Sequence, residues 1–208
     1  MTCIARTSSL LCEPTAVAYS RAMSEHAEDS ALMLRYKDGD IAAFEALYRR
    51  HNDSLYRYLV RLCFNRDVAE DIFQEVWRKV IGSRERYRPT AKFTTFLYRV
   101  AHNSFIDHVR RNARYRSSES LDPDALQSGG DPPEDAAEKQ IFRRRMEKAL
   151  RDLPVEQRDS FLLHEEGGLG LVDIAVITGV SRETVKSRLR YANTKLKNAL
   201  KEPTWDTR

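Results

Sequence analysis

Apolar residues recur in steps of three and four along most of the chain, the spacing that gathers them on one face of an α-helix. The first long run follows Asp40, which we expect to act as a helix N-cap, and is interrupted at Asn65-Arg66-Asp67. Its apolar positions are Phe44, Leu47, Tyr48, Leu55, Leu59 and Leu62. No segment alternates apolar and polar residues as a half-buried strand does, so the pattern predicts an all-α fold.

Two further helices are expected in the same half of the chain. Asp67 and Glu70 have the spacing of a capping box, and the helix that they would open ends near Gly82. Its inward positions are Val68, Ile72, Phe73, Val76, Trp77 and Val80. A basic loop from Ser83 to Lys92 then leads to a third helix. The apolar positions of that helix are Phe93, Phe96, Leu97, Val100, Ala101, Ile106 and Val109.

A segment rich in Ser, Asp, Pro and Gly, residues 117–138, separates this half from the next. It contains too little apolar surface to fold alone, so we expect a flexible linker. Helices resume at Lys139–Leu153. The residues expected to point inward there are Ile141, Phe142, Met146, Ala149 and Leu150. At the other end, residues 1–23 show no periodicity and are either a disordered tail or the product of a mis-set start, with translation beginning at Met23.

The predicted architecture is therefore two helical domains joined by a flexible acidic linker. The expected boundaries are 1–23 for the tail or mis-set start, 24–116 for the first domain, 117–138 for the linker, 139–202 for the second domain and 203–208 for a short tail.

Residues 171–200 have the spacing of a helix-turn-helix. Ala175 lies four residues before Gly179, which supplies the tight turn, and Val180 would fill the core beneath it. Ser181 is placed to cap the second helix. That helix would turn Val185, Leu189, Ala192, Leu196 and Ala199 inward and expose Arg182, Lys186, Ser187, Arg190 and Asn193. Such an exposed face suits phosphates and base edges in a major groove, although a helical hairpin with a solvated basic face is the alternative.

The net charge of +4 conceals an uneven distribution. Residues 24–116 carry +5, residues 117–138 carry −7 and residues 139–202 carry +5. Within the first domain, the stretch from Arg84 to Arg116 holds nine bases and two acids, interleaved with aromatic residues. Bases neutralise phosphates and aromatic faces stack on bases, so this composition suits single-stranded or melted nucleic acid. The alternative is that Phe93, Phe96 and Phe105 belong mainly to the core.

Several functional classes are excluded by the same sequence. No stretch approaches the roughly 18–20 apolar residues that a membrane span needs, so we expect no membrane insertion. Three cysteines without C-x-x-C spacing exclude a disulfide framework and a cysteine zinc site, and indicate a reducing cytoplasm. The histidines, His26, His51, His102, His108 and His164, are scattered, and no nucleophile motif is present. We therefore expect no metal, no cofactor and no catalysis.

Several motifs in order along the chain resemble one known family. ALYRRHNDSLYRYLVRL, DVAEDIFQEVWRKV and FTTFLYRVAHNSFIDHVRR, within residues 30–112, resemble region 2 of extracytoplasmic-function sigma factors, which belong to the sigma-70 family. LPVEQRDSFLL and GLVDIAVITGVSRETVKSRL, within residues 139–200, resemble region 4. The resemblance implies a cytoplasmic protein that binds core RNA polymerase, directs it to promoter DNA in a stress or envelope response, and is controlled by an anti-sigma factor.

The resemblance also implies which residues act. It assigns contact with core polymerase to Asp71, Gln74, Glu75 and Arg78. It assigns the −10 element to Tyr87, Lys92, Phe96, Tyr98, Arg99, Asn103, Arg110 and Arg111, with Asn103 in a pocket for a flipped base. It assigns the −35 element to Arg182, Thr184, Lys186, Ser187, Arg190 and Tyr191. A one-domain transcription regulator and an adaptor that binds polymerase without DNA are the competing classes.

Overall fold

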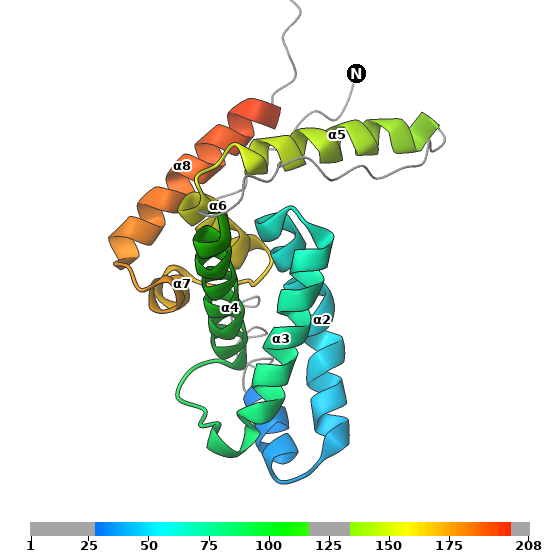
Figure 1. Cartoon of the computed structure of the whole chain (residues 1–208), viewed down its shortest axis with the longest axis vertical. Helices are drawn as coiled ribbons and strands as arrows, with labels where there is room; N and C mark the ends of the chain where they lie inside the picture. Colours follow the sequence, from blue (N-terminus) through cyan, green and yellow to red (C-terminus); the bar gives the residue numbers. More distant parts are fainter. Residues whose placement is uncertain (1–27, 117–133, 201–208) are drawn as a thin grey trace, which may run out of the picture.

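The computed structural model of the chain describes residues 28–116 and 134–200 (Figure 1). These two ranges contain helices and no strand, which confirms the predicted all-α class. A helix over 28–37 comes first. The elements that follow are α2 (Ile41–Cys63), α3 (Arg66–Gly82), the short 3₁₀ helix η1 (Arg84–Arg86), α4 (Phe93–Arg116), α5 (Glu134–Arg151), α6 (Val155–Glu165), α7 (Leu171–Thr178) and α8 (Arg182–Leu200). The predicted tails and most of the predicted linker lie outside the described residues.

Short polar side chains fix where the helices begin. The Asp40 carboxylate accepts a hydrogen bond from the backbone N–H three residues on, at 3.2 Å, which confirms its predicted role as a cap. Asn65 caps α3, because its Oδ1 accepts from the Val68 N–H at 3.0 Å. The capping box expected at Asp67 is therefore wrong. Since α3 begins at Arg66, Asp67 lies within the first turn, where its negative charge interacts favourably with the helix dipole.

In the first half of the molecule, α2, α3 and α4 pack around an apolar core, and the helix over 28–37 covers one end of it (Figure 1). Its largest fully buried side chains include Met33, Leu47, Leu55, Tyr58, Leu59, Leu62, Ile72, Phe93, Leu97 and Tyr98. Buried Asp29 ties the first helix to α2. Its carboxylate lies 2.5 Å from the Arg50 guanidinium and 2.8 Å from His51 Nε2.

In the second half, α5 packs on α8 only through its C-terminal part. Ala149, Leu150 and Leu153 form a small core there with Ala192 and Leu196. α5 begins at Glu134, five residues earlier than the predicted start, and its first turns extend beyond α8 (Figure 1).

Part of the predicted inward face of α5 is consequently wrong. Ile141 and Phe142 are 51% and 53% exposed, because none of the described residues covers this part of the helix. Val109 and Ala199, also expected on inward faces, are exposed near the ends of α4 and α8.

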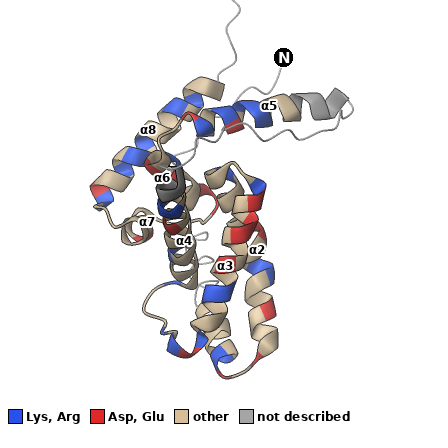
Figure 2. Ribbon diagram, viewed as in Figure 1, with Lys and Arg blue, Asp and Glu red and all other residues tan. Residues whose placement is uncertain are grey.

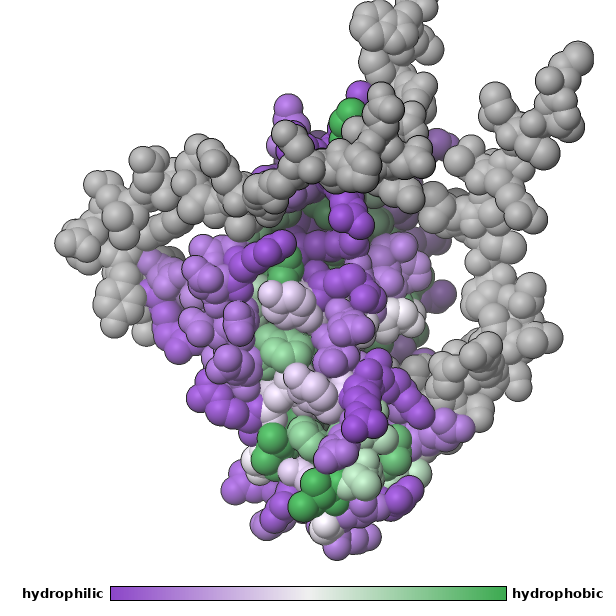
Figure 3. Space-filling model, turned by 90° about the vertical axis from the view of Figure 1, so that its right-hand side faces the viewer, coloured by the Kyte–Doolittle hydropathy of each residue, from purple (hydrophilic) through white to green (hydrophobic). Residues whose placement is uncertain are grey.

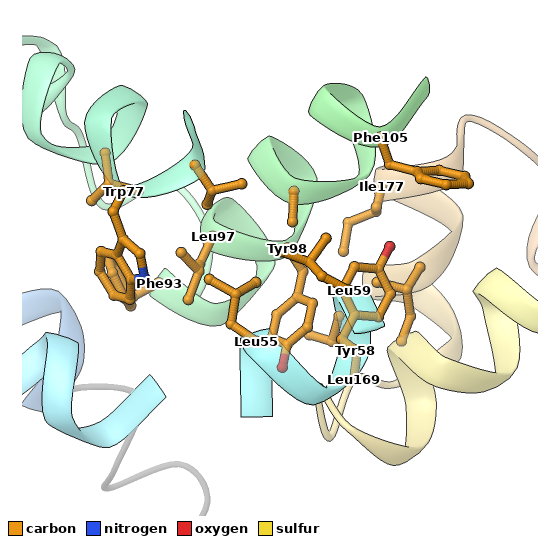
Figure 4. Packing of buried hydrophobic residues seen from close by; sticks show 14 of the residues in the cluster. Leu55, Tyr58, Leu59, Trp77, Phe93, Leu97, Tyr98, Phe105, Leu169 and Ile177 are labelled. Carbon is orange, nitrogen blue, oxygen red and sulfur yellow. The ribbon is translucent and has the colours of Figure 1, made fainter. Parts of the chain in front are cut away.

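The two halves share one apolar cluster. Leu169 and Ile177, from the second half, pack among Tyr58, Tyr98 and Phe105 from α2 and α4 (Figure 4). α6 and α7 accordingly lie against α2 and α4 (Figure 1). The two helical domains are therefore docked on each other, an arrangement that the sequence pattern did not indicate.

Candidate nucleic-acid interface

The helix-turn-helix predicted near the end of the chain is formed by α7 and α8. Gly179 has φ +70°, in the left-handed region that glycine adopts without strain, and it ends α7. Ser181 Oγ accepts a hydrogen bond from the Thr184 N–H at 3.1 Å, which confirms the predicted cap. Val185 and Leu189 are buried beneath α8, and Val180 packs against the same core. The turn and its supporting core are therefore arranged as the spacing predicts.

The outer face of α8 is basic and open. The six residues assigned to the −35 element are all exposed: Arg182, Thr184, Lys186, Ser187, Arg190 and Tyr191. Lys and Arg residues recur along the helix (Figure 2). The Arg190 guanidinium lies 5.1 Å from the ring centroid of Tyr191, which is itself 56% exposed. This face therefore presents cationic donors and one aromatic surface together, with the chemistry to contact phosphates and base edges.

The residues assigned to core polymerase lie along α3. Asp71, Gln74 and Arg78 are exposed, and Glu75 is partly buried beside them. The Glu75 carboxylate lies 2.6 Å from the Lys79 ammonium, and this hydrogen-bonded contact lowers the pKa of Glu75. Along α3 the acidic residues from Asp67 to Glu75 come before the basic pair Arg78 and Lys79, so the two charges occupy different stretches of the helix (Figure 2).

An aromatic row between α2 and α3 borders the same face, and sequence reasoning missed it. The ring centroids of Tyr48 and Trp77 are 4.9 Å apart, and those of Tyr56 and Phe73 are 5.7 Å apart. Tyr48 and Phe73, 6.3 Å apart, join the two pairs. On the side of the molecule that α2 and α3 form, hydrophobic side chains gather towards the lower end (Figure 3). The helical spacing placed Tyr48, Phe73 and Trp77 in the core. Trp77 is buried, but Tyr48 and Phe73 are partly exposed, and Tyr56 is 37% exposed.

The residues assigned to the −10 element fall into two groups. Lys92, Arg99, Asn103, Arg110 and Arg111 are exposed on α4 and the turn before it. Phe96 is half-buried, and Tyr87 and Tyr98 are buried. The ring of Tyr98 packs against that of Tyr58 on α2, with centroids 5.3 Å apart, and its hydroxyl donates a hydrogen bond to the Glu166 carbonyl of the second half at 3.0 Å. Burial raises the pKa of Tyr98 to about 12.

Three acidic residues of the second half form hydrogen bonds or ion pairs with side chains of the first half. Sequence reasoning missed all three. Asp159, Glu166 and Asp173 are seven residues apart along α6, the following turn and α7. We call them the acid row. Their partners lie in α2 and α4 or immediately before α4, and include Lys92, one of the candidate −10 residues.

Asp159 is the most buried member of the acid row. Tyr58 donates a hydrogen bond to its Oδ1 at 2.7 Å, and His102 Nδ1 lies 2.9 Å from its Oδ2. Burial raises the pKa of Tyr58 well above its usual value, so this tyrosine stays a protonated donor. The neighbouring Arg158 donates to the Leu62 carbonyl at 3.2 Å.

The other two members of the acid row contact basic side chains. Arg57 Nε donates to the Glu166 carboxylate at 2.8 Å, and Arg61 pairs with the same carboxylate. The Glu166 contact raises the pKa of Arg57. Asp173 accepts a hydrogen bond from the Thr95 hydroxyl at 3.0 Å and lies 3.4 Å from the Lys92 ammonium.

The remaining surface features are shallow. An open depression of about 360 Å³ between α3 and α4 is lined by Glu75, Asp107, Arg110 and Arg111. Across residues 28–116 and 134–200, no three His, Cys, Asp or Glu side chains converge in a way that could hold a metal ion. The helices in those ranges are also too short or too polar to cross a membrane.

Comparison with known families matches both halves of the chain. The Sigma-70 region 2 family covers residues 47–115, which include most of α2 together with α3 and α4. The Sigma-70, region 4 family covers residues 143–196, which include the helix-turn-helix. The two matches occur in the order that the sequence motifs predict.

Relatives of known name agree with these matches. The ECF RNA polymerase sigma factor SigE of Mycolicibacterium smegmatis is 34% identical over 177 residues, covering 81% of this chain and 67% of SigE. The RNA polymerase sigma factor CarQ of Myxococcus xanthus is 29% identical over 170 residues, covering 82% of this chain and 96% of CarQ.

Two solved structures share the fold. CnrH, solved in complex with the cytosolic domain of CnrY, is 20% identical with a TM-score of 0.62, over 83% of this chain and 97% of CnrH. The sigma factor RpoE of Bartonella quintana, solved with the anti-sigma factor NepR, is 24% identical with a TM-score of 0.59, over 76% of this chain and 96% of RpoE. With regions 2 and 4 both matched and a named relative above 30% identity, this chain belongs to the extracytoplasmic-function sigma factors of the sigma-70 family.

Proposed function

We propose that this chain binds core RNA polymerase through α3 and recognises promoters through two separate surfaces, one on α8 and one on α4. The observation that carries the proposal is the outer face of α8, where a helix-turn-helix exposes all six candidate −35 residues. The chain has a binding role and no catalytic step in this proposal. It acts in the cytoplasm, where core polymerase transcribes.

At the −35 element, α8 enters the major groove of duplex DNA. Lys186 and Arg190 are exposed and contact phosphates or the acceptor atoms of guanine, because cationic donors match both. Arg190 is also close enough to the ring of Tyr191 for the two side chains to restrain each other. This favours a defined side-chain arrangement on the groove-facing surface.

At the −10 element, α4 holds the melted strand. Asn103 is exposed, and its side-chain amide can both donate to and accept from the edge of a flipped base. Arg110 and Arg111 follow on the same helix and neutralise phosphates upstream. Phe96 is half-buried and offers a stacking surface, whereas Tyr98 is buried and would have to become exposed before its ring could stack on a base.

Core polymerase binds on α3 and the aromatic row beside it. The candidate contacts Asp71, Gln74 and Arg78 are exposed, and the partly exposed Phe73 and Tyr48 adjoin them. Aromatic residues surrounded by polar groups are typical of the strongest contacts in protein interfaces. This supports α3 as the polymerase-binding helix.

Control by an anti-sigma factor in a stress or envelope response is part of the proposal. RpoE of Bartonella quintana was solved with the anti-sigma factor NepR. We extend this mode of control to the present chain. An anti-sigma factor that bound α3 and its aromatic row would compete directly with core polymerase.

Run-off transcription tests the proposed function. The purified full chain is mixed with core polymerase from its own source and a library of promoter templates, and transcripts are sequenced. Specific transcripts that depend on both the chain and core polymerase support the sigma-factor function. Tight promoter binding by the chain alone, without such transcripts, would indicate a simple regulator, and polymerase binding without transcripts would indicate an adaptor.

A further inference from the structure

We propose that Arg190 and Tyr191 act together as one specificity determinant of α8, in which Arg190 contacts a guanine and Tyr191 contacts a thymine in the adjacent base pair of the −35 element. The inference rests on the proposed function, because it takes α8 as the helix that enters the major groove. It adds which bases these two side chains require and why the two bases are neighbours.

The first part of the argument is the fixed position of Arg190 and Tyr191 on the helix. The pair lies between Leu189 and Ala192, both of which are buried. The Arg190 carbonyl also accepts a hydrogen bond from the Thr194 hydroxyl at 2.9 Å. Buried neighbours on both sides fix the helix on the core, so the two exposed residues are held on its outer face.

The second part is the contact between the two side chains. The Arg190 guanidinium lies over the Tyr191 ring, 5.1 Å from the ring centroid, although both residues are exposed. A cation and an aromatic face attract each other at this distance. The N–H donors of a guanidinium lie at the edge of its plane, so a contact through its face leaves them free to donate. The ring therefore restrains the guanidinium without using its donors.

A restrained guanidinium favours a guanine over a phosphate. A phosphate accepts donors from many directions, whereas O6 and N7 of guanine accept two parallel hydrogen bonds from a planar group that is correctly oriented. Restraint by the Tyr191 ring reduces the side-chain entropy that is lost when Arg190 forms such a pair. Lys186, one turn earlier, is exposed and carries a compact charge without a planar set of donors, so it suits phosphates.

The exposed ring of Tyr191 suits a thymine. Tyr191 is the only aromatic residue of α8, and it is 56% exposed on the face that enters the groove in the proposed function. The apolar group that base pairs present in the major groove is the C5 methyl of thymine. Contact with this methyl removes apolar surface of both partners from water. Because the ring also contacts the Arg190 guanidinium, the thymine and the guanine belong to adjacent base pairs.

The experiment changes single groups of the DNA. The template is a promoter that the wild-type chain transcribes with core polymerase, and fluorescence anisotropy measures its binding to the reconstituted holoenzyme. In one series, each thymine of the −35 element on either strand is replaced by uracil, which lacks only the methyl group. In the other series, each guanine is replaced by 7-deazaguanine, which lacks only the N7 acceptor.

The wild-type holoenzyme should be sensitive to both changes at two adjacent base pairs. Uracil at one of them should weaken binding about two- to fivefold, because a buried methyl group is lost. At the other, 7-deazaguanine should weaken binding about three- to tenfold, because one hydrogen bond of the bidentate pair is lost.

Variants of the full chain assign each sensitivity to a side chain, after circular dichroism has verified that they are folded. Tyr191→Ala should abolish the sensitivity to uracil and reduce the sensitivity to 7-deazaguanine beside it, because Arg190 loses its restraint. Tyr191→Phe is the matched control, since it keeps the ring and should keep both sensitivities. Arg190→Ala should abolish the sensitivity to 7-deazaguanine. Lys186→Ala should weaken binding of all templates equally, as a phosphate contact does.

Three results overturn the inference. The first is a wild-type holoenzyme that is not sensitive to uracil and 7-deazaguanine at adjacent base pairs, and the second is a Tyr191→Ala variant that keeps the uracil effect. The third is loss of that effect in Tyr191→Phe, which would assign the contact to the hydroxyl. Any of these results with specific run-off transcription refutes the base assignment and leaves the sigma-factor function standing, whereas absence of specific transcripts refutes the proposed function itself.

Discussion

Asp159 is the most buried acid at the contact between the two halves. Its side chain is 6% exposed and receives a hydrogen bond from Tyr58, with His102 beside it. Both partners belong to region 2. A buried carboxylate whose partners come from another part of the chain stabilises one particular docking geometry, because any other leaves the charge without partners.

We expect Asp159→Asn to lower the free energy of unfolding by about 1–3 kcal/mol, because the charged acceptor of the buried hydrogen bond from Tyr58 is lost. Urea unfolding followed by circular dichroism measures this. Asp152→Asn, at an exposed position of the same region, serves as the control and should change stability by less than about 0.5 kcal/mol. Equal effects of the two substitutions would show that Asp159 has no special role.

Cys63 gives a prediction about reactivity and pH. Burial raises the pKa of its thiol to about 12, so almost no reactive thiolate is present at pH 8. Alkylation by iodoacetamide should be slow in the native chain and rapid in urea, as measured by mass spectrometry of the peptide that contains Cys63. The same burial disfavours ionisation, so the contribution of Cys63 to stability should fall as the pH rises from about 9 towards 12. Equal alkylation rates in the two states would contradict this burial.

Asn103 carries the prediction most specific to the −10 element. We expect Asn103→Ala to reduce open-complex formation while leaving core binding unchanged, because the side chain is exposed on α4 and the proposed polymerase contacts lie on α3. Permanganate footprinting measures strand opening, and co-purification with core polymerase supplies the control. Normal strand opening by the variant would remove Asn103 from the base pocket.

At the scale of the element, local chemistry determined where helices begin and end. Asp40, Gly179 and Ser181 have the predicted roles because capping and left-handed turns involve residues that are neighbours in sequence. The error at Asp67 has the same origin, since two candidate caps lie close together and Asn65 forms the cap. Ile141 was misjudged for a different reason. Periodicity shows which face of a helix is apolar, but not whether another element covers it.

The cap of α3 can be tested directly. Asn65→Ala removes the hydrogen bond to the Val68 N–H and should lower the free energy of unfolding by about 1 kcal/mol. Asn198→Ala, at an exposed position within α8, is the comparison and should have a much smaller effect. Chemical denaturation of both variants gives the difference. If the two substitutions lower the free energy of unfolding equally, the capping hydrogen bond of Asn65 does not stabilise the chain.

The recognition face of α8 gives a further prediction. Lys186→Ala and Arg190→Ala should each weaken binding of the polymerase holoenzyme to promoter DNA, and each should reduce the salt dependence if the side chain contacts a phosphate. Affinity measured over a series of salt concentrations separates phosphate contacts from base contacts. If neither the affinity nor its salt dependence changes, α8 does not bind DNA through this face.

At the scale of the whole molecule, the sequence predicted the two halves but not their contact. Tyr58 and Asp159 are 101 residues apart, and Arg57 and Glu166 are 109 residues apart. No local spacing connects such residues, and an acid on a helix surface has the same pattern whether it faces solvent or a distant arginine. The exposed candidate residues of α8 could be predicted, whereas the hydrogen bond from Tyr98 to Glu166, 68 residues away, could not.

The docked arrangement also requires the chain to change shape when it works. In the proposed function, Tyr98 contacts the −10 strand only after its hydrogen bond to Glu166 is broken. The 17 residues between α4 and α5 could span at most about 55–60 Å when fully extended, which is ample for the halves to separate. Binding of core polymerase to α3 would then be accompanied by opening.

The distance between the two halves tests this account most directly. Fluorophores are attached through Glu45→Cys on α2 and Lys197→Cys on α8, both exposed positions, in a chain whose own cysteines are replaced by Ser or Ala. Energy transfer is measured in the free chain and after addition of core polymerase. The account predicts a short distance in the free chain and a clear increase in the complex. An unchanged distance in a complex that initiates transcription would contradict it.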